Sequence, residues 1–226
     1  MNVFTFWEGK MPEYIAMCMN TWDFSYTILN YENLNRYTHL SIDALKRFTL
    51  PQIADIVRVH VLRDNGGYWL DADTIMLSET LPHVNIMGEP DTRINTIGYL
   101  YTTPQTIQMF EDWAKYQDSV IADSSQEGWD IVGNRFTDQY LKEHLEVSIG
   151  QIRNKWPETY MIKNDAPRRT KYVQFYFESS YYLSDLEPTN MLMLHNSWTP
   201  EEYKILSEME VLEGRCTLSN ILREMT

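Results

Sequence analysis

The chain has 226 residues, 43% of them hydrophobic and 13% aromatic, which is enough to bury the core of one large domain or two small ones. Its 32 Asp and Glu residues outnumber 19 Lys and Arg, giving a formal net charge of -13. A surface of this sign repels phosphate backbones and anionic lipid headgroups, so nucleic-acid binding and broad electrostatic membrane docking are poor expectations. A local basic patch or a bound metal would still hold a small anion.

Targeting and redox signals are sparse. The first ten residues, MNVFTFWEGK, lack a basic segment followed by an apolar stretch, and no run approaches the length of a membrane span. Cys18 and Cys216 are far apart and show no metal-ligand spacing, which indicates reduced thiols. We therefore expect a cytoplasmic protein, with any contact at the inner face of the membrane being peripheral.

The N-terminal part alternates strand-like and helical patterns. Residues 3–7 are β-branched and aromatic, residues 12–22 carry apolar side chains at helical spacing, and residues 26–31 are strand-like again. A short helix is expected over residues 45–48. This order is typical of the beginning of a βαβ fold.

A longer helix is predicted to begin after Thr49. Thr49 and Gln52 have the spacing of a capping box, and Pro51 is tolerated in the first helical turn. Apolar residues then recur every three to four positions up to about Arg63, where Asp64-Asn65-Gly66-Gly67 provides a stop signal.

Two acids interrupt the apolar run that follows this helix. Tyr68-Trp69-Leu70 predicts a buried strand, residues 74–77 predict another, and Asp71-Ala72-Asp73 separates them. Side chains two apart in an extended segment point to the same side, and α/β sheets open their ligand crevices at strand ends. A divalent cation would relieve the repulsion between Asp71 and Asp73. The alternative is a solvated turn, against which the preceding aromatic run argues.

The remaining patterns complete an α/β arrangement. They predict strands over residues 94–101, 172–177 and 191–194, and helices beginning near Pro104, over 130–145, over 200–209 after Thr199, and over 217–224. We therefore predict one α/β domain with a mostly parallel central sheet flanked by helices.

Two further groups of polar residues suit a ligand site. Asp55 and Arg58 lie three residues apart on the predicted helix, so they form either a surface ion pair or contacts to a sugar or an anion. The sequence His195-Asn196-Ser197-Trp198 follows an apolar strand, where His195 is either structural or a metal ligand.

Several stretches together resemble one family: residues 54–58 and 66–73, Phe6-Trp7, Tyr31 and residues 195–198. They resemble the GT-A glycosyltransferases that carry a DXD motif. The resemblance is to the capsular polysaccharide and mannosyltransferase-like group (glycosyltransferase family 32 type), related to the catalytic domain of large clostridial glucosylating toxins. It implies a single GT-A, Rossmann-like domain over residues 1–226. Residues 1–101 would bind the nucleotide sugar, and residues 102–226 would supply the acceptor side and the elements that close over metal and diphosphate.

The resemblance also implies a Mn²⁺ or Mg²⁺ cofactor. Asp73 would bind the metal with His195 or Asn196 as a second ligand, while Asp71 would serve the ribose or a metal-bound water. The resemblance further implies that Asp55 and Arg58 bind the donor sugar and that Ser197 and Trp198 bind the diphosphate. Phe6, Trp7 and Tyr31 would frame the nucleotide base, and Asn95, Asp130 and Asn134 would face the acceptor. Asp73, Arg58 and Asp55 would be the catalytic residues.

The implied reaction moves a hexose from a nucleotide diphosphate sugar, with UDP-hexose the first candidate, to a glycan or lipid-linked saccharide. Retention of anomeric configuration and a part in capsular or surface polysaccharide synthesis are implied as well. Two alternatives use the same residues. One is a haloacid dehalogenase-like phosphatase, with Asp71 as nucleophile and Asp73 as acid/base; the other is a non-catalytic module that binds nucleotide sugars or glycans.

Overall fold

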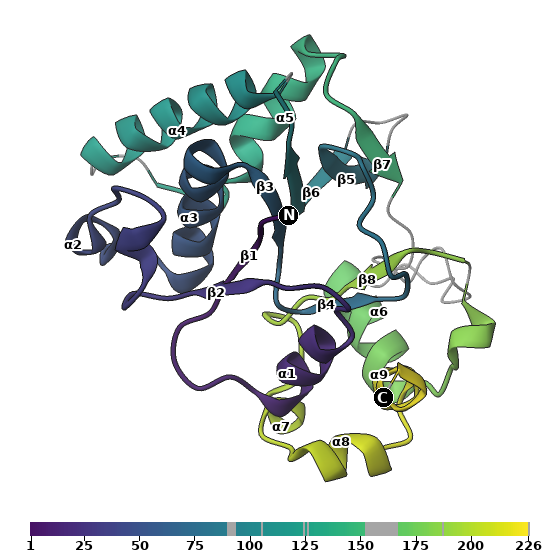
Figure 1. Ribbon diagram of the computed structural model, residues 1–226. Helices are drawn as coiled ribbons and strands as arrows, with labels where there is room; N and C mark the ends of the chain where they lie inside the picture. The colour runs from purple at the N-terminus through teal and green to yellow at the C-terminus, as the bar shows by residue number, and fades with distance from the viewer. Residues whose placement is uncertain are drawn as a thin grey trace. The chain divides into compact units, whose positions relative to one another are not determined.

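The computed structural model (Figure 1) describes residues 1–89, 94–104, 106–123, 125, 127–151, 167–186 and 188–225. The chain forms two compact units. The first unit comprises residues Met1–Gly9, Ser25–Asp71 and Pro82–Gln151, and the second comprises Lys10–Phe24, Ala72–Leu81 and Ile152–Thr226. That residues 1–226 act as one domain stays a prediction.

The first unit is built on a six-stranded sheet with the order β2-β1-β3-β6-β5-β7. β1 runs parallel to both β2 and β3, and β5 runs parallel to β7, whereas β6 is antiparallel to its neighbours β3 and β5. The strands are β1 (Val3–Phe6), β2 (Thr27–Leu29), β3 (Gly67–Leu70), β5 (Ile86–Glu89), β6 (Ile94–Thr102) and β7 (Ile149–Gln151). The mostly parallel sheet predicted from the sequence is confirmed.

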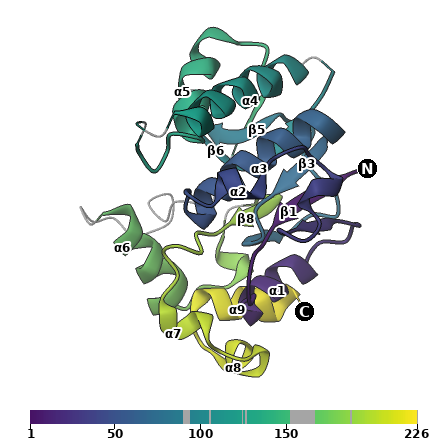
Figure 2. The same cartoon turned by 90° about the vertical axis from the view of Figure 1, so that its left-hand side faces the viewer.

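Helices cover this sheet and complete the core of the first unit. They are α2 (Ile42–Leu45), α3 (Leu50–Asn65), α4 (Ile107–Ala122) and α5 (Asn134–Glu143), with a short 3₁₀ helix, η1 (Leu34–Arg36). α3 packs on β1, β3 and β6 and lies beside α4 (Figures 1 and 2), and large side chains such as Trp69, Phe110 and Trp113 are buried there. Across the part of the chain that the structure describes, no helix is both long and apolar enough to cross a membrane.

The boundaries of α3 follow from its end residues. The capping box is present, and the backbone N–H of Thr49 donates to Oε1 of Gln52 at 3.0 Å. Gly66 ends the helix with φ 64° and Gly67 follows with φ 97°, conformations that favour glycine. These turns let the chain enter β3 directly, and the predicted start and stop of this helix are confirmed.

The second unit contains a two-stranded antiparallel sheet of β4 (Thr74–Met76) and β8 (Met191–Met193). Its other elements are α1 (Glu13–Asn20), α6 (Arg168–Val173), the π-helix η3 (Gln174–Glu178), the 3₁₀ helix η4 (Leu183–Asp185), α7 (Glu201–Lys204), α8 (Glu208–Glu213) and α9 (Thr217–Met225). Within this unit α1 packs against β4 and α8, and α9 packs against α8 and η3.

Three expectations are corrected. The strand predicted over residues 172–177 is wrong, because α6 continues there into η3, and Tyr172, Phe175 and Tyr176 are buried at helical spacing. The helix predicted over residues 200–209 is two helices, α7 and α8, because Ser207 forms a capping box that starts the second one. The helix expected over residues 45–48 instead ends at Leu45, where α2 stops.

Gly67 allows β3 to approach the N-terminal strand closely. A Cβ built there would collide with the backbone carbonyl of Asn2, the group that accepts a hydrogen bond from Tyr68 N at 2.9 Å. At Gly66 a Cβ would meet no atom within 4 Å.

We expect Gly67→Ala to lower the free energy of unfolding by about 1–3 kcal/mol more than Gly66→Ala, because both variants pay for a positive φ and only the first also forces the strands apart. Urea unfolding of the two variants measures the difference. Equal losses would mean that the close approach to Asn2 is not a constraint.

Candidate active site

A buried arginine joins two carboxylates in the first unit. α3 presents Asp55 and Arg58 one turn apart, and the chain leaving β3 presents Asp71. Nη2 of Arg58 lies 2.9 Å from Oδ1 of Asp55 and 3.2 Å from Oδ1 of Asp71. The Arg58 side chain is only 4% exposed, so this is not the surface ion pair that the sequence left open.

The rest of the Arg58 guanidinium is also engaged. Nη1 donates to the backbone carbonyl of Ile97, and Nε donates to that of Ala54 at 3.3 Å. The guanidinium carbon lies 5.1 Å from the centre of the Trp69 ring, within the range of a cation–π contact. Arg58 therefore ties α3 to β6 and fixes the two carboxylates relative to one another.

Asp71 is held in place by its neighbours on the sheet. Its backbone N–H donates to the carbonyl of Gly98 at 2.8 Å, and the indole N–H of Trp69 donates to its Oδ1 at 2.8 Å. The carboxylate remains 35% exposed, so Asp71 is oriented yet reachable. The sequence predicted no separate role for Trp69; the spacing of two residues between Trp69 and Asp71 was the available signal.

Asp55 is more enclosed, with its side chain 18% exposed. Burial raises the pKa of Asp55 to about 7; the nearby positive charge of Arg58 opposes this shift and the negative charge of Asp71 adds to it. Gln117 of α4 donates to the Asp55 backbone carbonyl at 2.9 Å. A Cβ at Gly133 would come within 2.7 Å of Asp55 Oδ2, so a side chain at that position would have to displace the carboxylate. No sequence pattern pointed to Gln117 as a partner of Asp55.

The residues predicted to frame the base lie together in the first unit. β1 is parallel to β2 and β3, so the carboxyl ends of the three strands point the same way. Phe6 is the last residue of β1, and Tyr31 and Asp71 follow the ends of β2 and β3. The Phe6 and Tyr31 rings meet edge to face with centroids 6.0 Å apart. Trp7 is positioned by its backbone N–H, which donates to the carbonyl of Leu29 at 3.0 Å.

The residues predicted to face the acceptor gather around α5. Asn95 on β6 donates to Asp138 at 3.0 Å, and Asp130 pairs with Arg135 at 2.8 Å. Asn134 begins the helix, and its buried Oδ1 has no hydrogen-bond partner among the described residues. All three predicted residues therefore belong to the same unit as Asp55 and Arg58.

Asp73 and Asn196 meet in the second unit. The backbone N–H of Asn196 donates to Oδ2 of Asp73 at 2.7 Å, and the N–H of Leu194 donates to the Asp73 carbonyl at 3.0 Å. Tyr14 donates to Oδ1 of Asn196 at 2.6 Å, and burial raises the pKa of Tyr14 well above its usual value, which keeps this donor protonated.

His195 and Trp198 stack on each other in the same unit. Their ring centroids are 4.1 Å apart, and the backbone N–H of His195 donates to the hydroxyl of Tyr172 at 3.0 Å. Ser197, between them in sequence, is exposed. The loop after β8 thus holds two stacked rings, His195 and Trp198, and exposes the Ser197 hydroxyl.

The donor types in the second unit suit a hard or borderline cation. Asp73 offers carboxylate oxygens and Asn196 an amide oxygen, and the backbone N–H of Asn196 donates to Asp73 Oδ2. His195 adds an imidazole on the same short loop. However, the described residues contain no group of three or more His, Cys, Asp or Glu side chains that could hold a metal ion. The metal ligands therefore stay a prediction.

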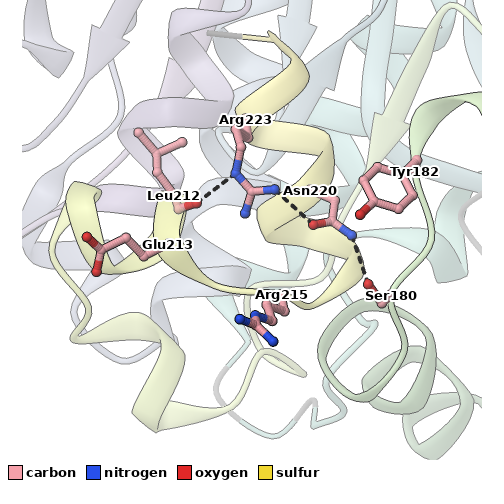
Figure 3. Close-up of a pocket in the computed structure, with 7 residues that line it drawn as sticks. All are labelled: Ser180, Tyr182, Leu212, Glu213, Arg215, Asn220 and Arg223. Atoms are coloured by element: carbon pink, nitrogen blue, oxygen red, sulfur yellow. Dashed lines mark hydrogen bonds between the residues drawn. The ribbon is translucent and has the colours of Figure 1, made fainter.

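The second unit also contains a pocket of about 550 Å³ that holds none of the predicted site residues (Figure 3). Arg223 forms one wall, where Nε donates to the carbonyl of Leu212 at 2.8 Å and Nη1 to Oδ1 of Asn220 at 3.1 Å. Asn220 in turn donates to Ser180 at 3.1 Å.

The family relationship of the chain follows from residues 1–167, which match the model of a family described as capsular polysaccharide synthesis protein. The chain belongs to this family. Among solved structures it is similar to one described as a glycosyltransferase involved in the glycosylation of the major capsid of PBCV-1. That match has a TM-score of 0.37 and 7% identity, and covers 70% of this chain and 86% of the other. A search of curated proteins gave no match.

The raised pKa of Asp55 predicts a pH dependence of stability. In the unfolded chain the carboxyl titrates near its ordinary value of 3.8, and in the folded chain at about 7. Between these two pKa values the folded state binds more protons than the unfolded state. This group therefore makes the free energy of unfolding fall as pH rises from about 4 to about 7, by at most about 1.4 kcal/mol per pH unit. Asp55→Asn should make this fall shallower, as measured by urea unfolding across that pH range.

Asp64→Asn is the matched control on the same helix. Burial alone would raise the pKa of Asp64, but the hydrogen bond and charge of Arg63 leave it lowered. This variant should therefore not make the fall of the unfolding free energy with pH shallower. An unchanged profile for Asp55→Asn would show that Asp55 titrates normally.

Proposed function

We propose that this protein is a glycosyltransferase that moves a hexose from a nucleotide diphosphate sugar, with UDP-hexose the first candidate, to a saccharide or lipid-linked glycan. The observation that carries the proposal is the buried Arg58 with its two carboxylates, in the same unit as Phe6 and Tyr31. Membership of the capsular polysaccharide synthesis family supports a product of this class.

Three residues of the first unit receive separate tasks. Asp55 accepts hydrogen bonds from hydroxyls of the donor sugar. Asp71, with Oδ1 already engaged by Trp69 and Arg58, uses its exposed side to bind the ribose. Arg58 is a positioning residue, because its Nε, Nη1 and Nη2 atoms all have protein partners and its main effect is to hold both carboxylates.

The donor diphosphate is assigned to the residues of the second unit. Asp73 with Asn196 or His195, and Asp71 in addition, would hold Mn²⁺ or Mg²⁺. Such a cation supplies positive charge that stabilises a departing nucleoside diphosphate more in the transition state than in the ground state. Ser197 has an exposed hydroxyl for a phosphate oxygen, and the Trp198 indole N–H is assigned a second such contact.

The transfer step is proposed to retain the anomeric configuration. The bond between the anomeric carbon and the phosphate oxygen breaks, the acceptor oxygen forms its bond on the same face, and the acceptor proton goes to the departing phosphate oxygen. The sequence offers no identifiable carboxylate nucleophile, which favours this front-face displacement over a covalent intermediate. Proton NMR of the first product is expected to show the donor's configuration, and an inverted product would contradict the mechanism.

Incubation with a panel of nucleotide sugars and Mn²⁺ separates the candidate functions. Slow release of nucleoside diphosphate supports glycosyl transfer, since water then replaces the acceptor. Release of phosphate from monoesters would instead support the phosphatase alternative, and binding without turnover of either substrate would support a non-catalytic module.

Asp73→Asn tests the proposed metal ligand. The amide keeps an oxygen that can accept the hydrogen bond from Asn196 N but loses the negative charge, so metal-dependent donor turnover should fall by about a hundredfold or more. The melting temperature should change little.

Asp185→Asn is the matched control. Oδ2 of Asp185 also accepts a backbone hydrogen bond, from Tyr182 N at 2.9 Å, but lies on η4. Turnover should be unchanged in this variant. Equal activity of the Asp73 and Asp185 variants would remove Asp73 from the metal site.

A further inference from the structure

Trp129 is exposed where an indole is normally covered. Its side chain is 78% exposed, in the turn between α4 and α5 of the first unit. Burying an indole removes a large apolar area from water and stabilises the folded state, and the exposed Trp129 does not contribute this stabilisation. The other described tryptophans are all buried or half-buried: Trp7, Trp22, Trp69, Trp113 and Trp198.

The backbone on both sides of Trp129 is fixed. The carbonyl of Gly128 accepts a hydrogen bond from Nε2 of Gln52 at 2.9 Å. On the other side, Asp130 pairs with Arg135 at 2.8 Å, and its carbonyl accepts from Gly133 N at 3.0 Å. An exposed ring on a held backbone loses little conformational freedom when it binds a ligand.

The same contacts bring Trp129 close to the proposed sugar site. Gln52 and Asp55 are three residues apart on α3 and so share one face of the helix. Gln52 holds Gly128, while Gly133 packs so tightly on Asp55 that a Cβ there would lie 2.7 Å from the carboxylate. The segment 128–133 therefore runs along this face of α3, with Trp129 near its start.

We propose that Trp129 is a stacking platform for a pyranose ring of the saccharide acceptor, an inference that rests on the proposed function. The electron-rich face of the indole attracts the C–H groups on the apolar face of a pyranose. Asp130 lies next to it in sequence and uses Oδ1 for Arg135, so its second oxygen is assigned to a sugar hydroxyl. An apolar surface with one or two polar groups beside it is the usual form of a ligand subsite.

Saturation-transfer difference NMR on the full chain tests the platform without donor or turnover. The probes are cellobiose, lactose, maltose and mannobiose. At least one should show saturation transfer to its pyranose ring protons, and Trp129→Ala should weaken its binding about tenfold, while Trp129→Tyr keeps most of the signal. Leu145→Ala is the matched control, since Leu145 is 75% exposed in the same unit; it should leave the signal unchanged.

The outcomes are separable from those of the donor assays. Signals that are equal in the wild type and Trp129→Ala, or absent from the wild type for all four disaccharides, would overturn the platform even if nucleotide sugars are turned over. Conversely, loss of signal in Trp129→Ala alone supports the platform even if no donor is hydrolysed. Circular dichroism should show an unaltered fold, because this side chain contributes little burial.

Discussion

The first unit depends on the charge of Arg58 being satisfied without water. Its guanidinium reaches the backbone of α3 and β6 and two carboxylates, and Trp69 covers it. Removing one partner of a buried ion pair costs about 3–5 kcal/mol, because the remaining charge stays buried. Here removal of Arg58 would also leave Asp55 and Asp71 facing each other, so one arginine maintains both the packing of α3 on the sheet and the geometry of the carboxylates.

The two acids of the Asp71-Ala72-Asp73 triplet have different surroundings. Asp71 is bonded within the first unit, to Trp69, Arg58 and the backbone of Gly98. Asp73 is bonded within the second unit, to the backbone of Leu194 and Asn196. The two acids are therefore held by different partners, which differs from a solvated turn with two equivalent acids.

The sequence predicted elements whose local signals agree with their packing. The Thr49 capping box and the Gly66-Gly67 stop define α3 by chemistry confined to a few residues, and both are confirmed. Residues 172–177 were wrongly predicted because aromatic and β-branched residues favour strands, whereas here burial every three to four residues makes a helical face. β5 and β7 are short and contain Gly88 and Gly150, so they lacked a strand signal. Partners distant in sequence were not foreseeable: Gln117 for Asp55, and Tyr14 for Asn196.

The protonation of Asp55 offers one way for an acidic chain to accept an anion. Asp55, Arg58 and Asp71 together carry one negative charge when all are ionised and none when Asp55 is protonated. With a pKa of about 7, Asp55 is divided between both forms near neutrality. A nearby anion favours the protonated form, because it disfavours a second negative charge, so binding and proton uptake are linked. The protonated carboxyl can also donate a hydrogen bond, so Asp55 can act as a donor as well as an acceptor. Burial beside Arg58 thus lowers the electrostatic cost of placing an anion near these three side chains without requiring an excess of basic residues.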